Sequence, residues 1–190
     1  MSREVSFFDP LFSFDRIGRG EMNDLLVRWG HKMGPIRRPE YTPPIDFAFR
    51  KDGQPIVVIA ADTLIRPTTG LDRSTGFELS RLCADPGTAK VSSLAMRMWR
   101  ALAYPLIVDA WKTPWVISYQ DAAQHTGNLY RYDGWVVRGY SVSGTDPRAN
   151  DDTAKVRRKI IWGWNADAAA MAEARTSPIT KPKWAESIAA

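Results

Sequence analysis

One segment in the second half of the chain, SYQDAAQHTGNLYRYDGW, carries several side chains that could move protons. Asp121, His125 and Tyr130 supply a carboxylate, an imidazole and a phenol, all of which serve as acids or bases in enzymes. Asp121 ends an apolar run typical of a strand, which is where ligand crevices of α/β sheets open. The alternatives are that Asp121 only caps a following helix and that Tyr130 only packs in the core.

A second group of candidates lies in the basic segment RWGHKMGPIRRPEY. His31 is a candidate general base or metal ligand. The cations Lys32, Arg37 and Arg38 could bind the phosphates of a polyanion such as DNA. The alternative is a solvated basic loop in which the histidine is incidental.

A third candidate site is the loop that joins a predicted strand, FELSRLCA, to a predicted helix. Backbone N–H groups and the positive end of a helix dipole attract anions, so a loop of this kind can hold a pyrophosphate. The alternative is a plain connection with a surface lysine. The candidate cofactor-binding residues are Cys83, Ala84, Gly87, Thr88, Ala89, Lys90, Val91 and Ser92.

Two residues of this strand are weighed as catalytic groups, and neither is assigned a catalytic role. Glu78 lies within the same predicted strand and either faces solvent, pairs with Arg81 or acts as a base. Cys83 is the only cysteine, which excludes an internal disulfide and a cysteine zinc cluster and fits a reducing cytoplasm. As a thiol it is expected to be a small core residue rather than a nucleophile. No metal ligand set is predicted from spacing.

The elements that must position these residues alternate between strand and helix patterns. Asp52-Gly53 is a two-residue turn signal between two strands. Leu94, Met98, Ala101 and Leu102 form the expected buried stripe of one helix, which Pro105 should end. The predicted strands are 47–51, 55–65, 77–84, 114–121, 136–142 and 159–164, and the predicted helices 24–29, 93–104, 124–133 and 166–175. This order predicts a mixed α/β sheet of about six to seven strands flanked by helices.

The length of 190 residues suits one domain. We expect an arm over about residues 1–20 and a tail over about 176–190. No apolar stretch is long enough for a membrane span, and the N-terminus does not resemble a signal peptide, so a cytoplasmic location is expected. The net charge of +5 fits a polyanionic partner as well as it fits ordinary solubility.

Two stretches carry a resemblance to a known family. FELSRLCADPGTAKVSSLAMRMWRALAY resembles the fourth strand, pyrophosphate loop and following helix of the acyl-CoA N-acyltransferase (GNAT) superfamily. HTGNLYRYDGWVVRG resembles the segment that closes its acyl-CoA cleft, with Leu129-Tyr130 and Gly134-Trp135 in the family pattern. The segments RLC, SYQDAAQHTGNLYRYDGW and RWGHKMGPIRRPEY are similar to the Mom-like DNA-modification proteins of bacteriophages.

This resemblance implies an anti-restriction enzyme that uses acetyl-CoA or a related acyl-CoA to modify the adenine amino group of double-stranded DNA in a bacterial host. It implies that His31, Asp121 and Tyr130 are catalytic. It also raises iron as a metal and a homodimer as an assembly. The first alternative is a GNAT enzyme acting on a small-molecule or protein amine. The second is a non-catalytic acyl-CoA or DNA-binding module, because the loop has one glycine, Gly87, and departs from the Arg/Gln-x-x-Gly-x-Gly/Ala pattern.

Overall fold

The structure is a computed structural model that describes residues 11–37, 44–88, 90–143 and 157–186. The strands are β1 (Phe12–Ile17), β2 (Ile45–Lys51), β3 (Gln54–Thr63), β4 (Gly76–Ala84), β5 (Trp115–Asp121), β6 (Val136–Ser143) and β7 (Arg157–Trp164). The helices are α1 (Arg19–Arg28), α2 (Ser92–Met98), the π-helical segment η1 (Trp99–Ala103), α3 (Tyr104–Trp111), α4 (Asn128–Tyr132), α5 (Ala168–Thr176) and α6 (Lys183–Glu186).

The strands within the described residues form one sheet of seven, in the order β1-β2-β3-β4-β5-β7-β6. Only the pair β4–β5 is parallel, and the other neighbouring pairs are antiparallel. The tight turn between β2 and β3 falls on Asp52 and Gly53, which both have positive φ. The mixed α/β sheet flanked by helices that the sequence predicts is therefore confirmed.

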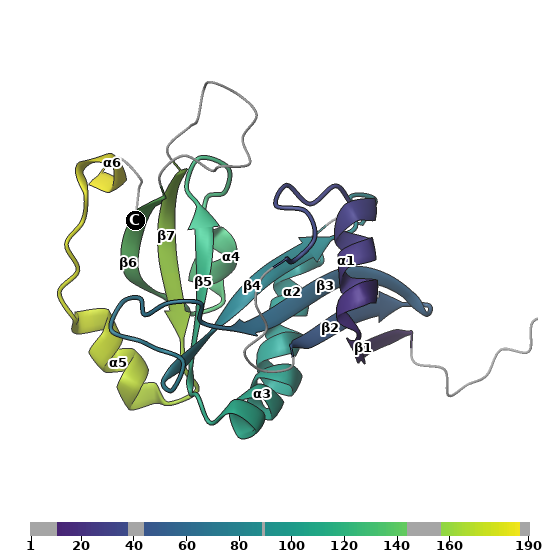
Figure 1. The fold of residues 1–190 in the computed structure, drawn as a ribbon, viewed down its shortest axis with the longest axis horizontal. Coiled ribbons are helices and arrows are strands. Elements are labelled where there is room, and N and C mark those ends of the chain that lie inside the picture. The colour runs from purple at the N-terminus through teal and green to yellow at the C-terminus, as the bar shows by residue number, and fades with distance from the viewer. Residues whose placement is uncertain (1–10, 38–43, 89, 144–156, 187–190) are drawn as a thin grey trace, which may run out of the picture.

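The sheet opens between its two central strands. The last backbone pair between β4 and β5 is Glu78 with Ile117, although both strands continue beyond it. Figure 1 shows the two strands diverging from this point, so that the sheet has the shape of a V. The loop that follows α1 lies beside the open end of this V.

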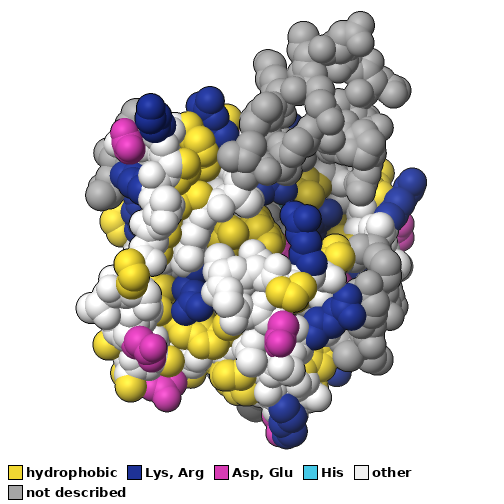
Figure 2. All heavy atoms as spheres, turned by 60° about the vertical axis from the view of Figure 1, so that its left-hand side comes forward, with side chains coloured by type: hydrophobic (Ala, Val, Ile, Leu, Met, Phe, Trp, Pro, Cys, Tyr) yellow, Lys and Arg dark blue, Asp and Glu magenta, His cyan; other side chains and the backbone are white. Residues whose placement is uncertain are grey.

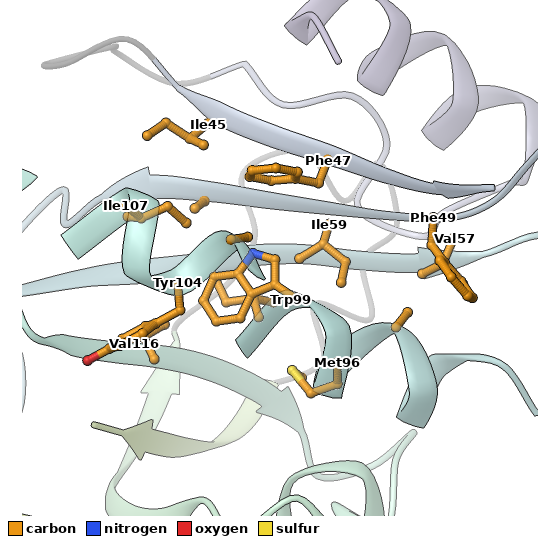
Figure 3. Packing of buried hydrophobic residues seen from close by; sticks show 14 of the residues in the cluster. Ile45, Phe47, Phe49, Val57, Ile59, Met96, Trp99, Tyr104, Ile107 and Val116 are labelled. Carbon is orange, nitrogen blue, oxygen red and sulfur yellow. The ribbon is translucent and has the colours of Figure 1, made fainter. Parts of the chain in front are cut away.

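The two faces of the sheet carry different cores. One face packs α1 through Met22, Leu25 and Leu26. The other face packs the helical run from α2 to α3, and Trp99 lies fully buried at its centre (Figure 3). Strand side chains alternate between these faces. We call them the α1 face and the Trp99 face.

The helix predicted over 93–104 is longer than expected and rotated about its axis. Pro105 does not end it, because the turn Trp99–Ala103 is π-helical and the helical run continues to Trp111. A π turn absorbs the hydrogen bond that proline cannot donate. Leu94 and Leu102 are exposed, contrary to the prediction, because the larger Trp99 takes the buried face. Ala101 is exposed as well, and Arg100 is half-buried.

Two other helix predictions need correction. The helix expected over 124–133 is reduced to Asn128–Tyr132, because residues 121–127 form turns that end at Gly127 with φ +79°. The helix expected from residue 24 begins at Arg19 instead. Asn23 lies inside that helix, where its side chain bonds the backbone of Ile36. Gly30 follows the helix with positive φ, as expected of a helix end.

The predicted arm and tail each contain regular structure within the described residues. β1 and the start of α1 fall inside the arm. In the tail, the ring of Trp184 packs edge-on against Tyr140, with 5.6 Å between centroids. None of the described helices is long and apolar enough to cross a membrane.

Candidate active site

A short chain of hydroxyl groups lies at the apex of the V. Ser118 Oγ donates to the Leu79 carbonyl at 3.0 Å, just past the last backbone pair of β4 and β5. Tyr130 Oη lies 2.9 Å from the same Oγ. A serine hydroxyl has one proton, and here it is committed to Leu79, so the Tyr130 hydroxyl must be the donor in this second bond. The Tyr130 hydroxyl is thus a proton donor at the apex of the V.

Aromatic rings fix the position of Tyr130. Its ring stacks on Trp162 with 5.4 Å between centroids and 12° between planes. Trp135 meets its edge at 5.4 Å. Burial raises the pKa of the Tyr130 phenol, and the negative charge of Glu78 raises it further. Tyr130 therefore stays protonated at neutral pH and remains a proton donor.

Glu78 reaches the opening from the opposite face to the hydroxyl chain. Its strand neighbours Phe77 and Leu79 belong to the Trp99 core, so alternation places Glu78 on the α1 face. Its pairing partner on β3 is Asp62, which binds Arg19 of α1 at 2.8 Å. Glu78 is thus the carboxylate at the apex on the α1 face, whereas Tyr130 lies on the Trp99 face.

A bulge in β4 widens the same region. Ala60 of β3 pairs with Arg81 and Ala61 pairs with Leu79, so Ser80 is left out of the backbone register between the two strands. A bulge interrupts the hydrogen-bond ladder and bends the strand, and such bulges are frequent beside active sites. The Ser80 hydroxyl bonds the buried carboxylate of Asp62, which holds the bulge against the α1 face.

His31 reaches the open end from the loop after α1. Burial, the charge of Arg81 and the charge of His125 lower the pKa of His31 to about 4. His31 therefore lies within electrostatic reach of β4 and of the turn after β5. Its Nδ1 accepts from the backbone N–H of Met33 at 3.3 Å, so the neutral ring carries its proton on Nε2. At neutral pH His31 is a hydrogen-bond donor with little basicity.

Asp121 organises the turn that follows β5. Its carboxylate accepts from the backbone N–H of Ala123 at 3.0 Å and from Gln124 Nε2 at 2.7 Å. Its carbonyl accepts from the backbone N–H of His125 at 3.1 Å. These bonds shape the turn that presents His125. The alternative that Asp121 caps the following helix is not what the structure shows, because α4 begins at Asn128 after Gly127 and no side chain caps it.

The loop after β4 combines internal bonds with an uncapped helix end. The Asp85 carboxylate accepts from the Gly87 N–H at 3.1 Å and from the Thr88 hydroxyl at 3.4 Å. Lys90 is exposed with φ +60°, and no side chain caps α2, which begins at Ser92. Backbone N–H groups of the first turn therefore remain available to a ligand. Ala89 lies outside the described residues, and burial raises the pKa of the Cys83 thiol to about 11.

The structure describes two of the three cations that were predicted to bind DNA. Lys32 and Arg37 are exposed in the loop after α1, and Arg38 lies outside the described residues. On the coloured part of the face drawn in Figure 2, Lys and Arg side chains lie singly among hydrophobic and polar ones. Among the described residues, no group of three or more His, Cys, Asp or Glu side chains could hold a metal ion, so an iron site finds no support there.

Solved structures with a similar arrangement of strands and helices are acetyltransferases. Arabidopsis thaliana NAA60 in complex with acetyl-CoA has 12% identity and a TM-score of 0.54, over 82% of this chain and 98% of that one. A putative acetyltransferase from Acinetobacter baylyi has 11% identity and a TM-score of 0.56, over 85% and 96%. An aminoglycoside 6'-acetyltransferase type Ii has 16% identity and a TM-score of 0.53, over 80% and 96%.

The fold is that of the N-acetyltransferases. At these low identities the likeness concerns the fold alone, and it agrees with the GNAT resemblance of the two sequence stretches. No family model and no curated protein sequence matches the chain. In this chain the sheet opens between β4 and β5, and Tyr130, Ser118 and Glu78 lie at that opening.

Sequence reasoning overlooked two polar residues in this site. Ser118 and Gln120 alternate with apolar residues in WVISYQD, yet both are buried. A polar residue on the inward face of a strand normally has a specific hydrogen-bond partner. Polar residues within an apolar strand were therefore the available signal of a site. The signal was hidden because the hydrogen-bond partners of Ser118 and Gln120 come from other segments of the chain.

Proposed function

We propose that the protein is an acyl-CoA-dependent N-acyltransferase whose reaction takes place in the opening between β4 and β5. The observation that carries this proposal is the hydroxyl chain from Tyr130 through Ser118 to the Leu79 carbonyl, at the apex of the V. Structural likeness to NAA60, a protein solved with acetyl-CoA, supports the donor class. An N-acyltransferase that acts on a small-molecule or protein amine is the first alternative function that the sequence suggests.

The loop after β4 has features that suit the diphosphate of an acyl-CoA. Anions bind where free backbone N–H groups and a helix dipole point the same way. The helical run that starts at Ser92 is uncapped and continues to Trp111, and Lys90 adds a positive charge beside it. The Asp85 carboxylate occupies the Gly87 N–H and the Thr88 hydroxyl, so the donors left for a diphosphate are the N–H groups of the first helical turn. These residues would hold the diphosphate and leave the acyl end at the apex.

Bound acyl-CoA would supply an electrophilic thioester carbonyl and a thiolate leaving group. An amine nitrogen forms a bond to that carbonyl carbon, the carbon–sulfur bond breaks, and the amine loses one proton. Tyr130 lies on the Trp99 face, and its proton would pass from the bond with Ser118 Oγ to the leaving sulfur. Glu78 lies on the α1 face as a carboxylate that would take the proton from the amine. The acyl-CoA would thus lie on the Trp99 face of the sheet and the acceptor amine on the α1 face.

His31 and Asp121 are assigned supporting parts in this scheme. His31 is neutral, and its Nε2–H would bind the acceptor at the open end of the V rather than remove its proton. Asp121 would position the turn that carries His125 opposite His31. Both residues therefore act on acceptor binding, while Tyr130 acts on the leaving group.

A nucleobase amine in DNA is a second candidate acceptor, as the resemblance to Mom-like proteins implies. The observation that favours it is an aromatic ring with a cation on the acceptor side. Tyr119 alternates with Ser118 and so faces the α1 side, and Lys159 Nζ lies 5.6 Å from its ring centroid. Aromatic rings beside cations stack bases and bind phosphates. An adenine in a duplex would first have to be flipped out.

Reversing the charge of Lys90 should weaken acyl-CoA binding about tenfold, which corresponds to about 1.4 kcal/mol. Isothermal calorimetry with acetyl-CoA measures this effect for Lys90→Glu. Lys112→Glu is the matched control, because Lys112 is also an exposed lysine with positive φ, and it should bind as the wild type does. Equal affinity of the two variants for acetyl-CoA would show that the diphosphate does not bind in this loop.

The acceptor class is tested by mass spectrometry of products. Purified protein with acetyl-CoA is offered a set of small amines, amine-bearing peptides and duplex DNA digested afterwards to nucleosides. We expect a mass increase of one acyl group on an amine of one class. Product on small amines or peptides alone supports the first acceptor class, and product on adenosine supports the second. Acetyl-CoA left intact with every acceptor would contradict the proposed function.

A further inference from the structure

Gln120 is a buried amide whose two polar ends are both committed. Its side chain is 2% exposed. Oε1 accepts from the indole N–H of Trp162 at 2.7 Å, and Nε2 donates to the His125 carbonyl at 2.5 Å. Exchanging the oxygen and nitrogen would face donor against donor and acceptor against acceptor, so the amide has one orientation. Gln120 therefore joins β7 to the turn after β5.

Both groups that bond to the Gln120 amide are connected to Tyr130 of the candidate active site. Trp162 is the ring on which Tyr130 stacks. The His125 carbonyl belongs to the turn that leads into α4, the helix that carries Tyr130. Gly127 shows how closely the parts fit, because a Cβ there would lie 2.5 Å from Gln120 Oε1 and 3.0 Å from the Trp162 ring. Movement of the Gln120 amide would therefore displace the base of α4.

We propose that Gln120 is a positioning residue for the Tyr130 hydroxyl, an inference that rests on the proposed function. It holds Trp162 beneath the Tyr130 ring and the turn at the start of α4 at the same time. The 2.9 Å bond between Tyr130 and Ser118 depends on both contacts. A reacting group displaced by about 1 Å can lose about 10²-fold in rate, so loss of one Gln120 bond should reduce kcat.

Gln120→Glu tests this role with a side chain of nearly the same shape. A carboxylate still accepts from the Trp162 indole but repels the His125 carbonyl. A protonated carboxyl group can accept from Trp162 and donate to His125, which restores both bonds. We expect kcat to fall about 10²-fold at high pH and to return toward the wild-type value as the pH falls, with KM for acyl-CoA nearly unchanged.

Two other variants serve as controls. Gln120→Met conserves volume but makes neither bond, so its loss of kcat should be the same across the pH range. Gln54→Glu places the same change at an exposed position at the start of β3, and should follow the wild-type pH profile. A Gln120→Glu profile parallel to that of the wild type would overturn the proposal.

A second readout does not need activity. The Tyr130 phenol is titrated by ultraviolet absorbance, with the spectrum of Tyr130→Phe subtracted. Burial raises its pKa in the wild type, and a displaced ring in Gln120→Glu or Gln120→Met should be more hydrated, so its pKa should fall toward the ordinary tyrosine value. An unchanged Tyr130 titration in both variants overturns the positioning role. Absent acyl transfer in the wild type would instead refute the proposed function alone.

Discussion

Tyr130→Phe should lower kcat for acyl transfer by about 10²- to 10⁴-fold, the usual contribution of one well-placed proton donor. The substitution removes only the hydroxyl. The ring still stacks on Trp162 and still meets Trp135, so the variant should fold and bind acyl-CoA as the wild type does. Steady-state kinetics with saturating acyl-CoA separate the expected fall in kcat from a change in KM.

Tyr132→Phe is the matched control for this result. Tyr132 lies on the same helix two residues further on, but its side chain is 78% exposed. Its hydroxyl should contribute nothing to the reaction, and kcat should stay at the wild-type value. Similar kinetics for the two variants would mean that the leaving thiolate is protonated by another group, and Tyr130 would then be a packing residue.

Asp133→Ala should lower the free energy of unfolding by about 3–5 kcal/mol, the cost of leaving one partner of a buried ion pair alone. The Asp133 side chain is 3% exposed, and its Oδ2 lies 2.6 Å from Arg100 Nε. Trp135 Nε1 also donates to it at 2.9 Å. The half-buried Arg100 guanidinium, 4.9 Å from the Trp164 ring centroid, would lose its anion. Urea denaturation measures the change.

The pair Asp109–Lys112 provides a control within the same helical run. Its atoms approach to 2.5 Å, but both side chains are largely exposed. Solvent screens such pairs, so the urea midpoint of Asp109→Ala should stay close to that of the wild type. Equal destabilisation by the two variants would show that the Arg100–Asp133 pair is not an anchor. The Arg100–Asp133 pair joins the π-helical turn to the end of α4. At that end the carbonyl of Tyr130 accepts from the backbone N–H of Trp135.

Local sequence patterns were sufficient for the mixed sheet and for the strands from β2 to β7, whereas β1 lies in the segment expected to be an arm. A nearly continuous run of Val, Ile and Ala marks β3, and Asp52-Gly53 marks the turn that the positive φ angles bear out. The same local logic failed at Pro105. A proline normally ends a helix, but a preceding π turn accommodates it, and burial of Trp99 supplies the reason to continue. Tertiary packing therefore overrode local propensity.

The candidate site was only partly accessible to sequence reasoning. Tyr130 could be named because the pattern around it resembles a known family. The partners that make it a donor, Ser118 and Glu78, come from strands whose separation follows from their short parallel pairing. That separation has no signal within either strand. Likewise the pKa of His31 is lowered first by burial and then by the charges of Arg81 and His125, which are distant in sequence.

The most direct test of the central claim is a crystal structure of the protein with a thioether analogue of acetyl-CoA. The account predicts a diphosphate at the first turn of the helix that begins at Ser92 and a sulfur within hydrogen-bond reach of the Tyr130 hydroxyl. The acyl carbon should lie at the apex of the V, between Tyr130 and Glu78. An analogue bound on another surface, or with its sulfur outside the opening between β4 and β5, would contradict the account.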